Sequence, residues 1–81
     1  MPYRILLFAV AKQRAGRDWI EVELPAGGTV RDLREALARQ VPPLAELLPH
    51  VRIAVNSEYA TDATPLGPAS EIALIPPVSG G

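Results

Sequence analysis

The 81-residue sequence predicts an α+β domain in which one main helix packs on one face of a β-sheet. Apolar and polar residues alternate between residues 20 and 24, which is the period of a strand with one buried face. Between residues 30 and 41 the apolar residues instead recur at steps of three and four, which is the period of a helix. The predicted order is two strands, the helix and then three strands.

The composition of the chain favours a single globular domain and excludes several classes of protein. Hydrophobic residues make up 48% of the sequence, which is too large a share for a disordered chain. The formal net charge is −1 and no basic stripe is present, so nucleic acid is not expected as a partner. The absence of cysteine excludes disulfides, thiolate catalysis and zinc–thiolate sites.

The first ten residues are apolar, but they do not have the pattern of a targeting segment. They lack the basic start and the small-residue cleavage site of a signal peptide. They are also too few to span a bilayer. We therefore expect a cytoplasmic protein with no membrane partner.

The N-terminal part of the chain is predicted to form a hairpin followed by the helix. Residues 3–11 form the first strand, residues 12–17 a polar turn and residues 18–24 the second strand. Thr29 is the expected N-cap of the helix, and Asp32 suits the positive end of the helix dipole. The apolar stripe of the helix consists of Val30, Leu33, Leu37 and Val41.

The helix is expected to end at Pro42-Pro43, since proline cannot continue it. A short helical turn is expected over residues 44–48. Three further strands follow, over residues 51–55, 58–60 and 71–75, and Asn56-Ser57 forms the turn between the first two of them.

The first and last strands are apolar on both of their faces, although one helix can cover only one face of a sheet. If these strands are neighbours, Phe8 and Ile75 lie on the face that the helix does not reach. An exposed apolar patch of this kind marks a surface for a protein partner. The alternative is that a loop covers the second face.

The body of the chain contains no recognisable catalytic or metal-binding pattern. His50 is the only histidine and has no evident acidic partner, while Glu58 and Asp62 are isolated acids. Gly27-Gly28 lacks the further glycine, lysine and hydroxyl residue of a phosphate-binding loop, so we interpret it as the bend into the helix.

The C-terminal segment is the most unusual part of the sequence. Its two prolines favour a stiff, extended exit from the sheet, and the residues after them are predicted to project as a thin, flexible strip. The final glycines carry no side chain, so a partner enzyme could close a narrow channel around the backbone there. The predicted tail consists of Pro76, Pro77, Val78, Ser79, Gly80 and Gly81.

The segment "IPPVSGG" at the end of this order of elements resembles the end of the small subunit of molybdopterin synthase. These MoaD-type sulfur carriers are relatives of the thiamine sulfur carriers and of ubiquitin. The resemblance extends to "ILLFAVAKQRAG", "TVRDLREAL" and "VNSEYA", and thus covers nearly the whole chain. One departure is Leu7-Phe8, where relatives often carry two aromatic residues.

The resemblance implies a ubiquitin-like β-grasp fold with a mixed sheet over residues 1–75 and an extended, flexible tail over residues 76–81. It implies that an activating enzyme of the ubiquitin-activating type uses ATP to adenylate Gly81. Sulfur supplied by a sulfurtransferase then converts the adenylate into a thiocarboxylate, which provides sulfur for the dithiolene of molybdopterin. No cofactor or metal would be bound by this chain.

The resemblance also implies a heterotetramer of small and large subunits. Phe8, Tyr59 and Ile75 would dock on the large subunit, and the residues from Pro76 to Gly80 would guide Gly81 into its active site. The large subunit would then supply the catalytic acids and bases of this sulfur transfer.

Three other functions are compatible with the sequence. The chain could be a sulfur carrier for thiamine biosynthesis, with the same terminal chemistry and another acceptor. It could be a ubiquitin-like modifier conjugated to lysines, in which case Lys12, its only lysine, is the single site for building chains. It could also be an adaptor domain in which the terminal glycines play no part.

Overall fold

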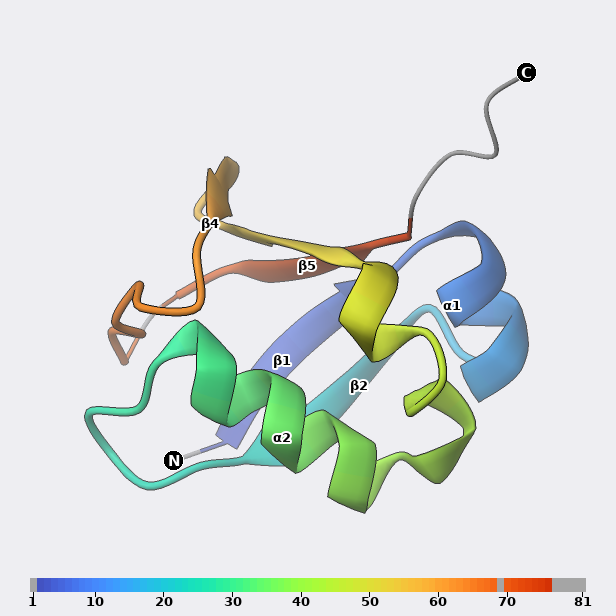
Figure 1. The fold of residues 1–81 in the computed structure, drawn as a ribbon, viewed down its shortest axis with the longest axis horizontal. Coiled ribbons are helices and arrows are strands. Elements are labelled where there is room, and N and C mark those ends of the chain that lie inside the picture. The colour runs from blue at the N-terminus through green and yellow to red at the C-terminus, as the bar shows by residue number, and fades with distance from the viewer. Residues whose placement is uncertain (1, 69, 77–81) are drawn as a thin grey trace.

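The structure is a computed structural model, and it describes residues 2–68 and 70–76. Five strands form one sheet, and helices pack against it (Figure 1). The elements in chain order are β1 (Pro2–Leu7), α1 (Ala9–Ala15), β2 (Trp19–Glu23), α2 (Val30–Gln40), the 3₁₀ helices η1 (Pro42–Leu44) and η2 (Leu48–His50), β3 (Arg52–Val55), β4 (Glu58–Ala60) and β5 (Ile72–Ile75).

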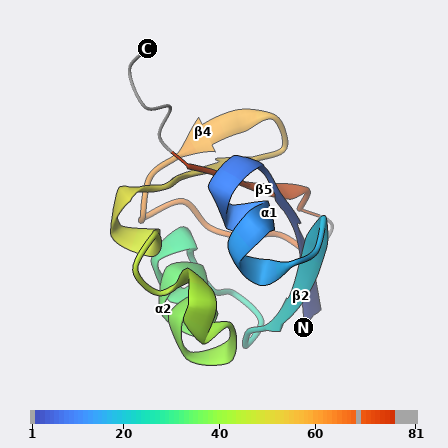
Figure 2. The ribbon, with the colours of Figure 1, turned by 90° about the vertical axis from the view of Figure 1, so that its right-hand side faces the viewer.

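The sheet is mixed, with the strand order β2-β1-β5-β3-β4. β1 and β5 run parallel in the centre, and every other neighbouring pair is antiparallel. The sheet curves from β2 to β4 around one side of α2 (Figure 2). The predicted fold class, a mixed sheet with one main helix on one face, is therefore confirmed.

The core lies between α2 and the face of the sheet that α2 covers. The predicted stripe of α2 points into it, because Val30, Leu33 and Leu37 are fully buried and Val41 is half-buried. Ile5 of β1 and Leu74 of β5 meet these side chains from the two central strands. Among the described residues no charged side chain is buried, and apolar packing dominates the core; the hydroxyl of Tyr3, which is buried there, donates a hydrogen bond to the carbonyl of Leu66.

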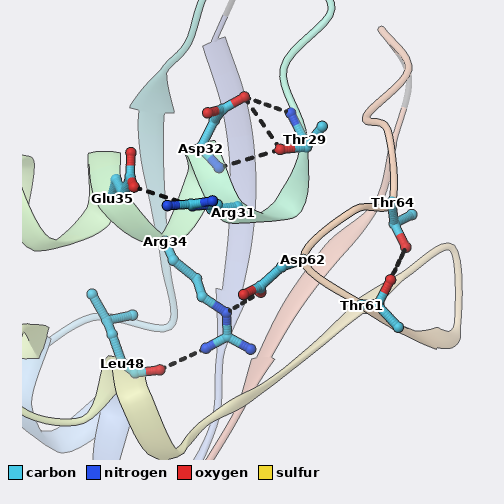
Figure 3. Close-up of polar contacts among 9 residues, drawn as sticks. All are labelled: Thr29, Arg31, Asp32, Arg34, Glu35, Leu48, Thr61, Asp62 and Thr64. Atoms are coloured by element: carbon cyan, nitrogen blue, oxygen red, sulfur yellow. Dashed lines mark hydrogen bonds and ion pairs between the residues drawn. The ribbon is translucent and has the colours of Figure 1, made fainter.

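The first turn of α2 is closed by a capping box and by the loop before β5 (Figure 3). The Thr29 hydroxyl accepts a hydrogen bond from the Asp32 amide, and the Asp32 carboxylate accepts one from the Thr29 amide at 2.9 Å. The amides of Val30 and Arg31 donate to the carbonyls of Thr64 and Asp62. All of these amides therefore have acceptors, and the predicted N-cap is confirmed.

Arg34 joins three segments of the chain on the same side of the molecule (Figure 3). Its Nε lies 2.9 Å from Oδ1 of Asp62, and its Nη1 donates a hydrogen bond of 2.6 Å to the carbonyl of Leu48. The guanidinium thereby links α2 to the loop after β4 and to η2.

The prediction of a strand over residues 3–11 and a turn over residues 12–17 is wrong from residue 8 onward. β1 ends at Leu7, and residues 9–15 form α1, a helix that ends at Gly16 in the left-handed conformation (φ 71°). Ala11 in this helix is fully buried. Periodicity could not reveal α1, because seven residues make only two turns and follow an apolar strand without a polar interruption.

The other predicted boundaries of helices and strands differ from the observed ones by small amounts. The predicted helical turn over residues 44–48 is replaced by η1, which ends at Leu44, and η2, which begins at Leu48. The turn at Asn56-Ser57 is confirmed, and both residues have positive φ values (52° and 70°), as the tight turn of a hairpin requires.

No helix within the described part of the chain is long and apolar enough to cross a membrane. The cytoplasmic location expected from the sequence stays a prediction.

Replacement of Thr29 by alanine is expected to lower the free energy of unfolding by about 1 kcal/mol, because it removes the side-chain half of the capping box. Chemical denaturation followed by circular dichroism measures this change. The control is Gln13→Ala on the exposed side of α1, which is expected to change stability by less than about 0.5 kcal/mol. Equal stability of the two variants would contradict the capping role.

Candidate functional site

The face of the sheet that α2 does not cover, here named the open face, carries a row of side chains across all strands. Residues that pair in register across neighbouring strands lie on the same face. Following the register from β2 to β4 gives the row Trp19, Leu6, Ala73, Ala54 and Tyr59. The row contains no charged side chain, so the centre of the open face is apolar.

Three residues that the sequence assigns to a docking surface come together at one end of the open face. Phe8, Tyr59 and Ile75 line one surface depression together with Ala54, Ser57 and Ala73. Phe8 and Tyr59 are 49% and 64% exposed, so no loop of the described chain covers them. The strand alternation had placed Phe8 and Ile75 on this face, whereas Tyr59 is brought to them by the pairing of β4 with β3. Their contact with a partner stays a prediction.

The predicted tail begins at this same depression. β5 ends at Ile75, and the next residue, Pro76, is buried. The predicted tail residues Pro77, Val78, Ser79, Gly80 and Gly81 lie outside the described residues. The open face therefore adjoins the point where the chain leaves the sheet.

Trp19 is a candidate that the sequence analysis did not select. It is 37% exposed at the opposite end of the row, next to Leu6 on β1. The strand alternation had placed it on the polar side of the second strand together with Glu21 and Glu23. An aromatic residue on the outward face of a strand was the signal that could have identified it.

The described residues offer no site for catalysis by a metal ion. No group of three histidine, cysteine or acidic residues is close enough to hold a metal in this part of the chain. His50 is exposed at the end of η2. The bend at Gly27-Gly28 leads into the capping box of α2, where a phosphate group would meet the carboxylate of Asp32.

The mixed sheet curved around one main helix, with an apolar open face beside the end of the last strand, defines a ubiquitin-like β-grasp domain. The sequence model of the ThiS family matches residues 5–81, which is nearly the whole chain. The chain belongs to the ThiS family.

Named proteins from several organisms are similar to this chain over most of its length. The molybdopterin synthase sulfur carrier subunit of Arabidopsis thaliana is 36% identical over 78 residues, which cover 96% of this chain and 81% of that protein. The same subunit of Dictyostelium discoideum is 38% identical, with coverage of 98% and 95%. Small archaeal modifier protein 1 of Haloferax volcanii is 34% identical, with coverage of 93% and 95%.

Solved structures share the fold over the full length of the chain. The crystal structure of small archaeal modifier protein 1 from Haloferax volcanii superposes with a TM-score of 0.86 at 29% identity, and the match covers 100% of both chains. A chain from the complex of subunits 1 and 2 of the molybdopterin-converting factor of Helicobacter pylori matches with a TM-score of 0.70 at 26% identity, also over both full chains.

Replacement of Phe8 by lysine is expected to leave the domain folded, because the side chain at this position is half-exposed and a lysine can reach solvent. The free energy of unfolding is expected to change by less than about 1 kcal/mol. The control is Leu7→Ala, one residue earlier and 3% exposed, which is expected to cost about 2–5 kcal/mol. If Phe8→Lys costs as much as Leu7→Ala, Phe8 belongs to the core and its assignment to the open face is wrong.

Proposed function

We propose that this chain is the sulfur carrier subunit of a molybdopterin synthase and that Gly81 is the residue that carries the sulfur. The observation that supports this most strongly is the similarity to named sulfur carrier subunits over nearly the full chain. The family match runs through residue 81 and so includes the glycine pair. A domain without catalytic groups of its own is suited to this role, because the reacting group is its own main-chain carboxylate.

The proposed chemistry has two steps. The Gly81 carboxylate attacks the α-phosphate of ATP, which gives an acyl-adenylate and releases pyrophosphate. Sulfur released by the donor protein at the oxidation level of hydrosulfide then forms a carbon–sulfur bond at the acyl carbon, while the bond to AMP breaks, AMP leaves and the S–H proton is lost to solvent. The first step is needed because a carboxylate has no good leaving group, and the product is a thiocarboxylate, a soft nucleophile that stays covalently attached.

The proposed partner of the open face is the large subunit of molybdopterin synthase, in a heterotetramer of small and large subunits. The matched Helicobacter structure is a complex of subunits 1 and 2 of a molybdopterin-converting factor, which supports a partner of this kind. Ile75 lies in the depression that Phe8 and Tyr59 line. The segment after Ile75 can span at most about 20 Å, so docking at this depression would bring Gly81 into a nearby active site.

The open face would also have to be released between steps. The activating enzyme and the large subunit both need the C-terminal glycine, so one small subunit would serve them in turn.

A second candidate function is that of a ubiquitin-like modifier. The observation in its favour is the likeness to small archaeal modifier protein 1, which covers the full length of both chains. Lys12 is exposed and its Nζ lies 2.7 Å from Oδ1 of Asp18. As the only lysine, it is the only side chain that could accept a second copy. A carrier for thiamine biosynthesis is compatible with the family match but has no further observation in its favour.

After incubation with ATP, a sulfur source and cell extract, the C-terminal peptide is expected to show exchange of oxygen for sulfur at Gly81. Accurate mass spectrometry of the isolated peptide measures this, and the peptide is needed because oxidation of Met1 or Trp19 would mimic the shift in the intact chain. A protein without Gly81 serves as the control and is expected to support no molybdopterin formation. Full activity of that variant would exclude the carrier function.

Phe8→Lys is expected to weaken binding to the large subunit at least about tenfold, because it places an ammonium group in the apolar centre of the interface. Isothermal titration calorimetry measures the affinity. Ala63→Lys adds the same charge in the loop that packs on the N-terminus of α2, and it is expected to bind like the unaltered chain. Equal affinities of both variants would place the interface elsewhere.

A further inference from the structure

The two aromatic ends of the row across the open face are each accompanied by arginine side chains. The guanidinium carbon of Arg52 lies 5.2 Å from the ring centroid of Tyr59. At the other end, the guanidinium carbons of Arg4 and Arg17 lie 4.4 and 5.8 Å from the ring of Trp19. These are cation–π distances, so the guanidinium groups are held at the surface of the rings.

These arginines differ from most of those on the rest of the domain. Within the described part of the chain, Arg4, Arg17 and Arg52 form no ion pair with a carboxylate, and Arg39 on α2 is the one other arginine of this part without one. The paired arginines are Arg14, Arg31 and Arg34. The unpaired set on the open face therefore retains its hydrogen-bond donors for an external acceptor.

Asp18 and Glu21 adjoin two of these arginines but form no ion pair with them. Asp18 follows Arg17 directly, but its carboxylate pairs with Lys12 at 2.7 Å. Glu21 lies opposite Arg4 in the register of β1 and β2, yet the Arg4 guanidinium lies over Trp19 instead. A carboxylate from another molecule could therefore reach these guanidinium groups without displacing an internal partner.

The Trp19 end of the row is continuous with the depression at the Tyr59 end. Phe8 lines that depression and also a second one, formed with Leu6, Lys12 and Asp18 among others. Leu6 in turn lies beside Trp19 in the sheet. A partner seated on Phe8 would therefore meet both depressions, because this side chain is common to them.

We propose that the docking face extends across Leu6 to Trp19, and that the protein partner meets it with carboxylate side chains opposite Arg17 and Arg52. The apolar row would form the centre of the interface and the arginines its charged rim. This inference rests on the proposed function, since it assigns the chemistry of the partner that binds the open face.

The observations favour an acidic protein surface over a nucleic acid. Glu21 and Glu71 lie on the same side of the domain near Arg4, so the positive charge of this face is confined to separate arginines and does not form the continuous basic stripe that a phosphate backbone requires. The apolar row would also face no matching surface on a phosphate backbone. Tryptophan, tyrosine and arginine are the residue types that contribute most to protein interfaces.

The test measures association of the chain with the purified large subunit of molybdopterin synthase from the same organism, by surface plasmon resonance. At about 50 mM salt, Arg17→Glu and Arg52→Glu are each expected to lower the association rate constant about tenfold, because rim charges act mainly on association. At about 500 mM salt the difference is expected to shrink, since the charges are then screened. Trp19→Ala is expected to raise the dissociation rate constant about tenfold.

The matched control is Arg39→Glu, which makes the same charge reversal on the exposed surface of α2 and is expected to stay within about twofold of the unaltered chain. Thermal unfolding of each variant verifies that it is folded. If Arg17→Glu and Arg52→Glu associate like Arg39→Glu, or faster, the inference is overturned while the proposed function stands. If the unaltered chain does not bind the large subunit at all, the proposed function fails and the inference fails with it.

Discussion

The parallel pairing of β1 with β5 in the centre of the sheet is the interaction on which the rest of the structure depends. Parallel strands end at the same edge of a sheet, so the residue after β1 and the last residue of β5 must emerge together. Phe8 and Ile75, which are far apart in the sequence, thereby line one depression. The same pairing places the end of β5 beside the apolar patch, so the proposed docking surface and the proposed reacting terminus belong to the same edge of the sheet.

A second constraint is that both faces of the sheet carry apolar side chains, whereas the one main helix can cover only one of them. α2 is held on its face by a fully buried stripe, by the capping box at Thr29 and by Arg34, which joins it to Asp62 and Leu48. These contacts leave no second layer for the other face. The apolar area there is a consequence of how the chain is divided between strands and helices, and it is the surface that the proposed protein partner would cover.

In the proposed function, binding and reaction belong to different parts of the molecule. The domain presents a binding surface, while its own main chain is the proposed reacting group. The described residues contain no group of histidine, cysteine or acidic residues that could hold a metal, and the one buried titratable side chain among them is Tyr3, whose hydroxyl donates a hydrogen bond to the carbonyl of Leu66. In the proposed function, specificity would depend on which partners recognise the aromatic and arginine side chains of the open face.

Local patterns in the sequence were sufficient for the second strand, for α2 with its cap at Thr29, and for the turn at Asn56-Ser57. Each of these depends on residues that are neighbours in the chain, so periodicity, capping and turn preference apply directly. The apolar character of both faces of the first and last strands also predicted the open face. The short helix α1 was missed, since two turns directly after an apolar strand contain too few residues to establish a period.

Only the tertiary structure could decide which side chains meet on the open face. The convergence of Tyr59 with Phe8, and the row from Trp19 to Tyr59, depend on strand order and register between segments separated by much of the chain. The arginines over Trp19 and Tyr59 are likewise brought there by strand pairing and by the turn before β2. The sequence alone determined that both faces of the first and last strands are apolar, because that follows from the residues along each strand. That no loop of the described chain covers the open face, and which side chains form it, was decided by the tertiary structure, since strand pairing is encoded by no local pattern.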